Sequence, residues 1–154
     1  MRARTTALTV LAAVLLTGVA VAAKSTVTSL AVAKRTVAGK TKTIVVDQRG
    51  VTAYELGGES LAKLECVSKA CFALWPPLKV ASATAKPNLG PGVPGTVSII
   101  HRVKGGFYQV MLDRHPLYYY SGDAGRKGKT TGQGITGFGG TWHVVTATKP
   151  TPSP

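Results

Sequence analysis

Short apolar runs, rich in β-branched and aromatic residues, alternate with turn residues through the middle of the chain. Strands are predicted in six such runs: residues 43–46, 51–54, 96–103, 107–112, 117–120 and 140–146. Turn signals at 47–50 and 104–106 join the first four runs into two hairpins, because glycine supplies the positive φ that tight turns need. Only residues 61–74 could form a helix, and a short one. The pattern predicts an all-β, mainly antiparallel single domain.

The N-terminal residues differ in composition from the rest. Arg2 and Arg4 precede an uncharged apolar run at 7–23 that ends in small residues, which is typical of a secretory signal peptide. An uncleaved N-terminal anchor is the alternative, because a run of about 17 residues is at the lower edge of what spans a bilayer. We predict a signal peptide over residues 1–23, no stable transmembrane helix after cleavage, and a secreted or extracytoplasmic protein.

Two further segments lack the strand pattern. Residues 24–42 contain five basic residues, no acid and no aromatic, which predicts a basic linker because like charges repel rather than pack. Residues 147–154 alternate proline with Ser, Thr and Lys, which predicts an extended proline-rich tail. We therefore expect a β domain over residues 43–146, flanked by disordered N- and C-terminal arms.

The net charge narrows the choice of partner. The chain carries 19 Lys and Arg against 6 Asp and Glu, a formal charge of +13, and without residues 1–23 the counts are 17 and 6, or +11. An apolar fraction of 44% excludes a wholly disordered basic tail, and two cysteines exclude a disulfide-dense scaffold. An exported protein does not meet genomic nucleic acid, so we do not expect that partner. The charge favours an anionic cell-envelope polymer or lipid surface.

The two halves of the predicted domain are similar in the order and spacing of their residues. In the first half an Asp-containing turn precedes Tyr54, and Trp75 follows 21 positions later. In the second half another Asp-containing turn precedes Tyr118, and Trp142 follows 24 positions later. Neither half would bury a hydrophobic face alone. We predict two quasi-repeats that pair into one sheet.

Each half also contains a specific motif. Residues 118–123, Tyr-Tyr-Tyr-Ser-Gly-Asp, fit the pattern Yx[FWY]xxD, and Cys66 and Cys71 lead into Trp-Pro-Pro-Leu at 75–78. With these motifs, residues 43–146 resemble a bacterial secreted repeat of unknown function, found in predicted lipoproteins with a Yx(FWY)xxD motif. The resemblance implies an exported bacterial envelope protein built from paired repeats. It implies no established activity and no catalytic residues.

The chain departs from the family pattern in three ways. In the first half, residues 54–59 correspond to the motif, which we call the first motif. Leu56 stands at its aromatic position and Glu59 at its Asp position, so a ligand site shared with the family is expected in the second half. Three basic residues follow Asp123 where family members often carry a second acid, which argues against an acid-based cation site. No cysteine stands directly after the predicted signal peptide to carry a lipid.

Cys66 and Cys71 are the two cysteines of the chain. An oxidising exterior favours a disulfide between them, which would clamp the loop that leads to Trp75. A redox centre is a weaker alternative, because it would more naturally use a CxxC spacing beside a helix start. A zinc site is also weaker, because it would need two further Cys or His ligands at matching spacing.

The second motif suggests a binding surface of aromatic and basic side chains. Its candidate residues are Tyr118, Tyr120, Asp123, Arg114, Arg126, Lys127, Lys129, Trp142 and His143. Tyrosines could stack on sugars while basic groups hold an anion. In a strand, however, Tyr118 and Tyr120 point to one face and Tyr119 to the other, so core packing is the competing interpretation.

Catalysis has weaker support in the sequence. No nucleophile motif is present, so enzymatic activity stays open and a non-catalytic role is favoured. A metal- or haem-linked redox partner would have to use His101, His115, His143 or Met111. Their spacing matches no metal motif, and neither a metal site nor a cofactor is predicted. A hydrolase would require Asp113 and Asp123 to share one pocket. The leading hypothesis is an exported protein that binds an anionic envelope component.

Overall fold

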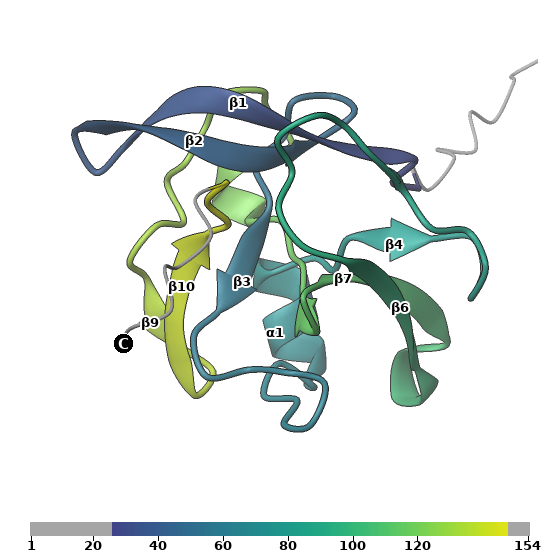
Figure 1. Ribbon diagram of the computed structural model, residues 1–154. Coiled ribbons are helices and arrows are strands. Elements are labelled where there is room, and N and C mark those ends of the chain that lie inside the picture. The colour runs from purple at the N-terminus through teal and green to yellow at the C-terminus, as the bar shows by residue number, and fades with distance from the viewer. Residues whose placement is uncertain (1–25, 148–154) are drawn as a thin grey trace, which may run out of the picture.

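The computed structural model describes residues 26–147, and strands supply most of its regular structure (Figure 1). The strands are β1 (Ser29–Val37), β2 (Lys40–Asp47), β3 (Tyr54–Leu56), β4 (Lys79–Val80), β5 (Asn88–Leu89), β6 (Val97–Arg102), β7 (Phe107–Leu112), β8 (His115–Pro116), β9 (Thr136–Gly137) and β10 (Gly140–Val144). The helical elements are α1 (Lys69–Leu74) and the 3₁₀ helices η1 (Val103–Gly105) and η2 (Ser121–Asp123). The all-β prediction is confirmed.

The strands form small sheets that are antiparallel apart from the pairing of β1 with β5. The strand orders are β2-β1-β5, β3-β10-β9 and β4-β7-β6, with β8 beside β7. In Figure 1 the β1–β2 hairpin lies across the top of the molecule, above β3 and β10, and the β6–β7 hairpin lies to their right. In the part of the chain that the structure describes, no helix is long and apolar enough to cross a membrane. The predicted signal peptide and most of the tail lie outside the described residues.

The prediction of a basic linker is wrong for residues 29–42, which form β1 and the start of β2. The strands pair in register from Leu30 opposite Asp47 to Val37 opposite Lys40. Ala38 and Gly39 join them with φ values of 48° and 78°, as a tight two-residue hairpin turn requires. Leu30 and Val37 are buried, while the basic residues lie at exposed or half-buried positions. Burial of β1's apolar positions outweighs the repulsion expected between its charges.

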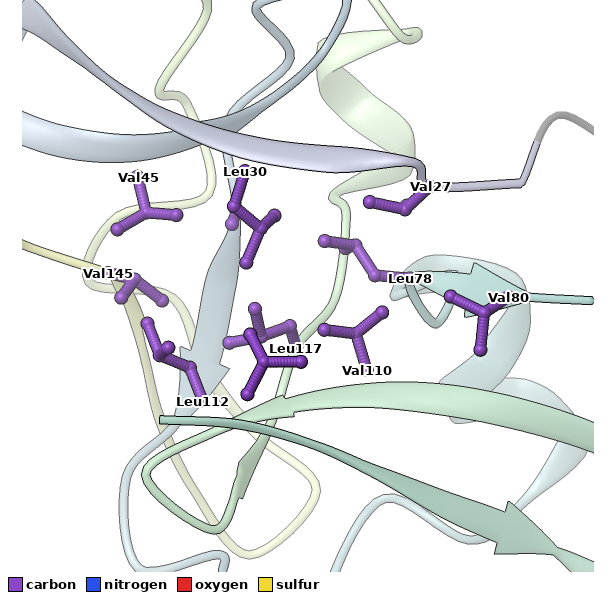
Figure 2. Close-up of a cluster of buried hydrophobic side chains, with 11 residues drawn as sticks. Val27, Leu30, Val45, Leu78, Val80, Val110, Leu112, Leu117 and Val145 are labelled. Atoms are coloured by element: carbon purple, nitrogen blue, oxygen red, sulfur yellow. The ribbon is translucent and has the colours of Figure 1, made fainter. Parts of the chain in front are cut away.

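One hydrophobic cluster fills the space between the β1–β2 hairpin and the β6–β7 hairpin (Figure 2). Its labelled members come from both halves of the chain: Val27, Leu30, Val45, Leu78, Val80, Val110, Leu112, Leu117 and Val145. Backbone hydrogen bonds tie the same segments together. The Val45 amide donates to the Val145 carbonyl (2.8 Å), and the Val110 amide donates to the Leu78 carbonyl (2.9 Å). The β1–β2 and β6–β7 hairpins therefore each bind a segment from the other half of the chain.

The tyrosine segments also pair across the halves. The Tyr54 amide donates to the Tyr118 carbonyl (2.8 Å) and the Tyr118 amide to the Tyr54 carbonyl (2.9 Å). Tyr54 then pairs with Val144 of β10, and Tyr118 forms a bridge with Pro77. The segment containing Tyr54 thus lies beside the strand that carries Trp142, and Tyr118 lies beside the segment that follows Trp75. The description of the halves as two quasi-repeats stays a prediction.

Candidate functional site

The structure divides the predicted binding surface into a buried set and an exposed set. Tyr118 and Trp142 have no exposed surface and Asp123 is 2% exposed. Tyr120 is half-buried and His143 is exposed. The buried residues therefore lie in the core, as the competing interpretation holds, and no open cleft unites the whole set.

Two stacked indoles form the centre of the buried set. Trp75 and Trp142 lie 3.9 Å apart between ring centroids, with an interplanar angle of 5°. Tyr118 packs edge-on against Trp142 at 5.1 Å, and Tyr54 packs edge-on against Trp75 at 5.6 Å. Tyr120 covers Trp75 at 4.6 Å. Each tryptophan comes from a different half, so this stack holds the halves together.

Each buried tyrosine donates its hydroxyl to the motif acid of the opposite half. The Tyr54 hydroxyl donates to Asp123 Oδ2 at 2.6 Å, and the Tyr118 hydroxyl donates to Glu59 Oε1 at 3.1 Å. Burial is the main cause that raises the pKa of both hydroxyls above the usual value for tyrosine, so both stay protonated donors. The acid position of the Yx[FWY]xxD pattern is thus an internal acceptor.

The two acids have different further partners. Asp123 Oδ1 accepts hydrogen bonds from the Thr131 amide (3.1 Å) and the Thr131 hydroxyl (2.6 Å), both in the loop that follows η2. Glu59 Oε1 accepts from the Glu65 amide (3.0 Å) and the Cys66 amide (3.1 Å). Its neighbourhood also contains a cation, Arg102.

Arg102 is a buried basic residue that sequence analysis missed. Its Nη1 lies 4.0 Å from Glu59 Oε1, and its Nη2 donates to the Cys66 carbonyl. Burial raises the pKa of the Glu59 carboxyl, while the Tyr118, Cys66 and Glu65 hydrogen bonds and the Arg102 charge oppose that shift. The available signal was an arginine near the end of the predicted strand at 96–103.

The predicted disulfide is confirmed. Cys66 and Cys71 are bonded, with their Cα atoms 5.6 Å apart. The Ser68 hydroxyl caps α1 by accepting from the Cys71 amide at 3.0 Å. Both cysteines are buried, and α1 leads directly into Trp75. The bridge therefore fixes the segment that delivers one of the two stacked indoles.

The exposed set is concentrated on the loop after η2. Arg126, Lys127 and Lys129 are all exposed. The loop is held against β1 and the segment after β2, because the Thr130 hydroxyl donates to the Thr36 carbonyl at 2.8 Å and the Thr52 hydroxyl donates to the Lys129 carbonyl at 2.5 Å. The three cations therefore have a fixed backbone beneath them.

Arg114 lies apart from the cations of the loop after η2. It lines a separate hollow with Thr96, Ser98 and Asp113. Asp113 accepts a hydrogen bond from the Thr96 amide at 2.8 Å. The structure therefore does not bring Arg114 together with the cations that follow η2.

A groove of about 400 Å³ lies near the start of the cationic loop. Its lining includes Arg49, Tyr119, Tyr120 and Ser121, with Pro76 and Pro77 from the segment after Trp75. The Tyr119 hydroxyl and Arg49 Nε both donate to Asp47 Oδ2 at 2.8 Å, so these two groups are held in place. The exposed cations Arg126, Lys127 and Lys129 do not line this groove but follow Gly125, which does. We call Arg49, Tyr119, Tyr120 and these three cations together the basic groove.

Acidic groups are scarce on the described surface. Between residues 26 and 147, twelve of the fifteen Lys and Arg residues are exposed, whereas Asp113 is the one exposed acid. Three acids are buried, each with hydrogen bonds to protein donors: Asp47, Glu59 and Asp123. Burial of these acids leaves the surface more basic than the overall composition indicates.

The geometry gives the catalytic alternatives no shared site. His101 stacks on Tyr108, His115 contacts the Glu59 carbonyl and His143 contacts Gln133. Within residues 26–147, no group of three or more His, Cys, Asp or Glu side chains could hold a metal ion. Asp123 is buried against Tyr54, while Asp113 lines its separate exposed hollow, so the two do not face one pocket.

Residues 99–146 match a family model described as a secreted repeat of unknown function. This segment is similar to that family. The match agrees with the resemblance drawn from the second motif, and it includes Tyr118, Asp123 and Trp142. The matched segment also contains Arg102 and the loop with Arg126. No curated protein and no solved structure matches the chain.

Proposed function

We propose that the protein is an exported, non-catalytic binding protein whose basic groove holds an anionic polymer of the bacterial cell envelope. The observation that carries the proposal is the placement of charge: the motif acids are buried as internal acceptors, while twelve of the fifteen Lys and Arg residues between 26 and 147 are exposed. A surface with one sign of charge attracts a polyanion over several ångströms. The family description, a secreted repeat, supports a partner outside the cytoplasm.

The basic groove combines the features that a polymer of charged sugars or polyol phosphates would use. Tyr119 and Tyr120 supply flat rings and phenol groups, and Arg49 lies over the Tyr119 ring at 5.5 Å. Further positive charge lies on the loop beyond the groove, at Arg126, Lys127 and Lys129. Several weak contacts spaced along a chain would add up, because each further charge is bound as part of the same molecule.

The test is binding to isolated bacterial cell walls, before and after their phosphate polymers are removed with acid. The wild type should bind intact walls, and binding should fall as salt rises from about 0.1 M to about 1 M, over which the screening length shortens from about 10 Å to about 3 Å. Stripped walls should bind at least about tenfold less. Absent binding at low salt, or binding that salt leaves unchanged, would overturn the proposal.

Matched charge variants locate the site. The triple variant Arg126→Gln, Lys127→Gln, Lys129→Gln should lose about tenfold in affinity, which corresponds to about 1.4 kcal/mol. The control Lys40→Gln, Lys63→Gln, Lys86→Gln removes the same charge from other exposed positions. Equal losses in the two variants would contradict a localised groove.

A further inference from the structure

An apolar pocket lies on a part of the surface that the basic groove does not include. It has a volume of about 310 Å³ and is lined by Leu64, Val67, Phe72 and Val103, together with His101, Arg102, Lys104 and Gly105. Val67 and Val103 are 52% and 77% exposed, the highest values among the large exposed hydrophobic residues. Two exposed valines at the rim of a pocket indicate a surface that binds an apolar group.

A basic hollow of about 510 Å³ continues from this pocket. The two share Val67, Phe72, Lys104 and Gly105 as lining residues. The hollow adds Lys69 and Lys79, and Lys79 Nζ lies 4.4 Å from the Phe107 ring centroid. No acidic residue lines either cavity. An apolar space therefore opens directly onto a space bordered by three lysines.

The walls of the pocket are held in place by other contacts. Phe72 and Phe107 pack edge to face at 5.4 Å, and the Arg102 guanidinium lies 5.3 Å from the Phe72 ring centroid. The Cys66–Cys71 bridge holds α1, which carries Phe72. A pre-formed site saves the ligand the cost of ordering the protein.

We propose that these joined cavities bind one molecule of an anionic amphiphile, with its alkyl chain in the apolar pocket and its phosphate or carboxylate head among Lys69, Lys79 and Lys104. The pocket volume is at the lower end of the range for ligand sites, which suits one chain. Neighbouring apolar and cationic surfaces complement the two ends of such a molecule. The hollow adjoins the groove beside Tyr119, because Pro76, Pro77 and Lys79 line both. The inference does not rest on the proposed function, since the residues of the apolar pocket, together with Lys69, do not line that groove.

The experiment compares octyl phosphate, butyl phosphate and octyltrimethylammonium, each below its micelle concentration, by calorimetric titration of the wild-type protein. Each buried methylene tightens binding about fourfold, so four extra methylenes should tighten it by about 100-fold or more. Octyl phosphate should therefore bind far more tightly than butyl phosphate. The cationic amphiphile should bind at least about tenfold more weakly than octyl phosphate. Equal binding of the two phosphates, or of the two octyl compounds, would overturn the site.

Surface variants separate the two ends of the ligand. The change Val67→Ser with Val103→Ser should reduce the advantage of octyl over butyl phosphate by about tenfold, while Leu89→Ser with Phe138→Ser changes exposed apolar residues elsewhere and should not. The change Lys69→Gln with Lys104→Gln should weaken both phosphates, and the control Lys40→Gln with Lys86→Gln should not. Equal effects in variant and control would contradict the assignment.

Two further arms distinguish this site from other anion binding. The Arg126, Lys127 and Lys129 triple variant should keep full affinity for octyl phosphate; a parallel loss would mean that the basic groove binds it instead. Phosphatidylglycerol vesicles test a membrane surface as the occupant. If these vesicles bind through Val67 and Val103 while monomeric octyl phosphate does not bind, the single-molecule site is overturned in favour of a membrane-docking surface.

Discussion

Glu59 and Asp123 hold matching places in the two halves, yet they are stabilised differently. Asp123 accepts hydrogen bonds from neutral donors, the Tyr54 hydroxyl and Thr131. Glu59 receives the Tyr118 hydroxyl and two backbone amides, and it also has the buried Arg102 within 4.0 Å. One carboxylate is held by neutral dipoles alone, and the other by dipoles and a cation.

The difference follows from the departure in the first motif. Among the described residues, no hydrogen-bond partner faces Glu59 Oε2, whereas both oxygens of Asp123 accept hydrogen bonds. A buried carboxylate with an unsatisfied oxygen is costly to ionise, and a nearby cation offsets part of that cost. The first half therefore depends on a residue of the second half, Arg102, that has no counterpart at Asp123.

Removal of Arg102 should have the largest effect. The change Arg102→Met leaves the Glu59 charge buried without its cation, and we expect a loss of about 3–5 kcal/mol in the free energy of unfolding. The change Thr131→Val removes a neutral donor from Asp123 and should cost about 2 kcal/mol. Urea denaturation of both variants at pH 7 measures the difference.

A compensating change checks the cause. If the lost cation is the reason, adding Glu59→Gln to Arg102→Met should recover stability, because the amide is neutral. No recovery would mean that Arg102 acts through packing on Phe72 rather than through charge. Equal losses in Arg102→Met and Thr131→Val would remove the distinction between the two acids.

Loss of the disulfide should have an intermediate effect. The bridge closes a short loop in the first half, and the double change Cys66→Ser, Cys71→Ser should cost about 2 kcal/mol in the chain-entropy account. Thermal unfolding of the wild type with and without reductant measures the same loss. The serine variant provides the control, since reductant should leave its midpoint unchanged; a reductant effect on that variant would point to another cause.

The pH dependence of Glu59 should be the smallest effect. Burial raises the pKa of this carboxyl above its usual value of 4.5, so the folded protein holds the proton more tightly than the unfolded chain. Stability from this group is therefore full below about pH 4.5 and is lost as pH rises through the folded pKa. The stability of Glu59→Gln relative to wild type should increase from pH 4 to pH 7.

Glu55 does not confuse that comparison. Its pKa is also raised by burial, but it is present in both proteins, so its contribution cancels in the difference. Chemical denaturation across the pH range gives the difference directly. A constant difference, or one that shrinks as pH rises, would show that Arg102 and the hydrogen bonds outweigh desolvation at Glu59.

Local pattern predicted the parts of the fold that depend on local chemistry. The β6–β7 hairpin lies where alternating residues flank the glycines at 105 and 106, and the short loop between Cys66 and Cys71 closes as expected. The pattern does not indicate strand β1, because basic residues stand between its buried apolar positions, Leu30 and Val37. The turn at 38–39, which contains a glycine, was the signal for it.

The candidate site was harder to predict because its contacts are long-range. The Arg102–Glu59 pair joins residues from different halves, and no local pattern specifies which tyrosine meets which acid. Spacing predicted one site for Tyr118, Asp123 and Trp142; the structure packs Tyr118 against Trp142, while Asp123 pairs with Tyr54 of the other half. Spacing could not show that they face inward, since a strand with tyrosines on both faces has no obvious outer side. The exposed cations were predicted from composition, but their support on the β1–β2 hairpin was not.

The crossed tyrosine–acid pairs also affect how the chain reaches its folded state. Tyr54 and Asp123 are 69 positions apart, and Glu59 and Tyr118 are 59 positions apart. During synthesis the N-terminal part of the chain emerges first. Tyr54, Glu59 and Trp75 are therefore exposed long before their partners are made. Contacts so distant in sequence make folding slow. Tyr54 and Glu59 therefore lack their partners until residues 118–123 have emerged, and we expect the two halves to close together in a late step of folding.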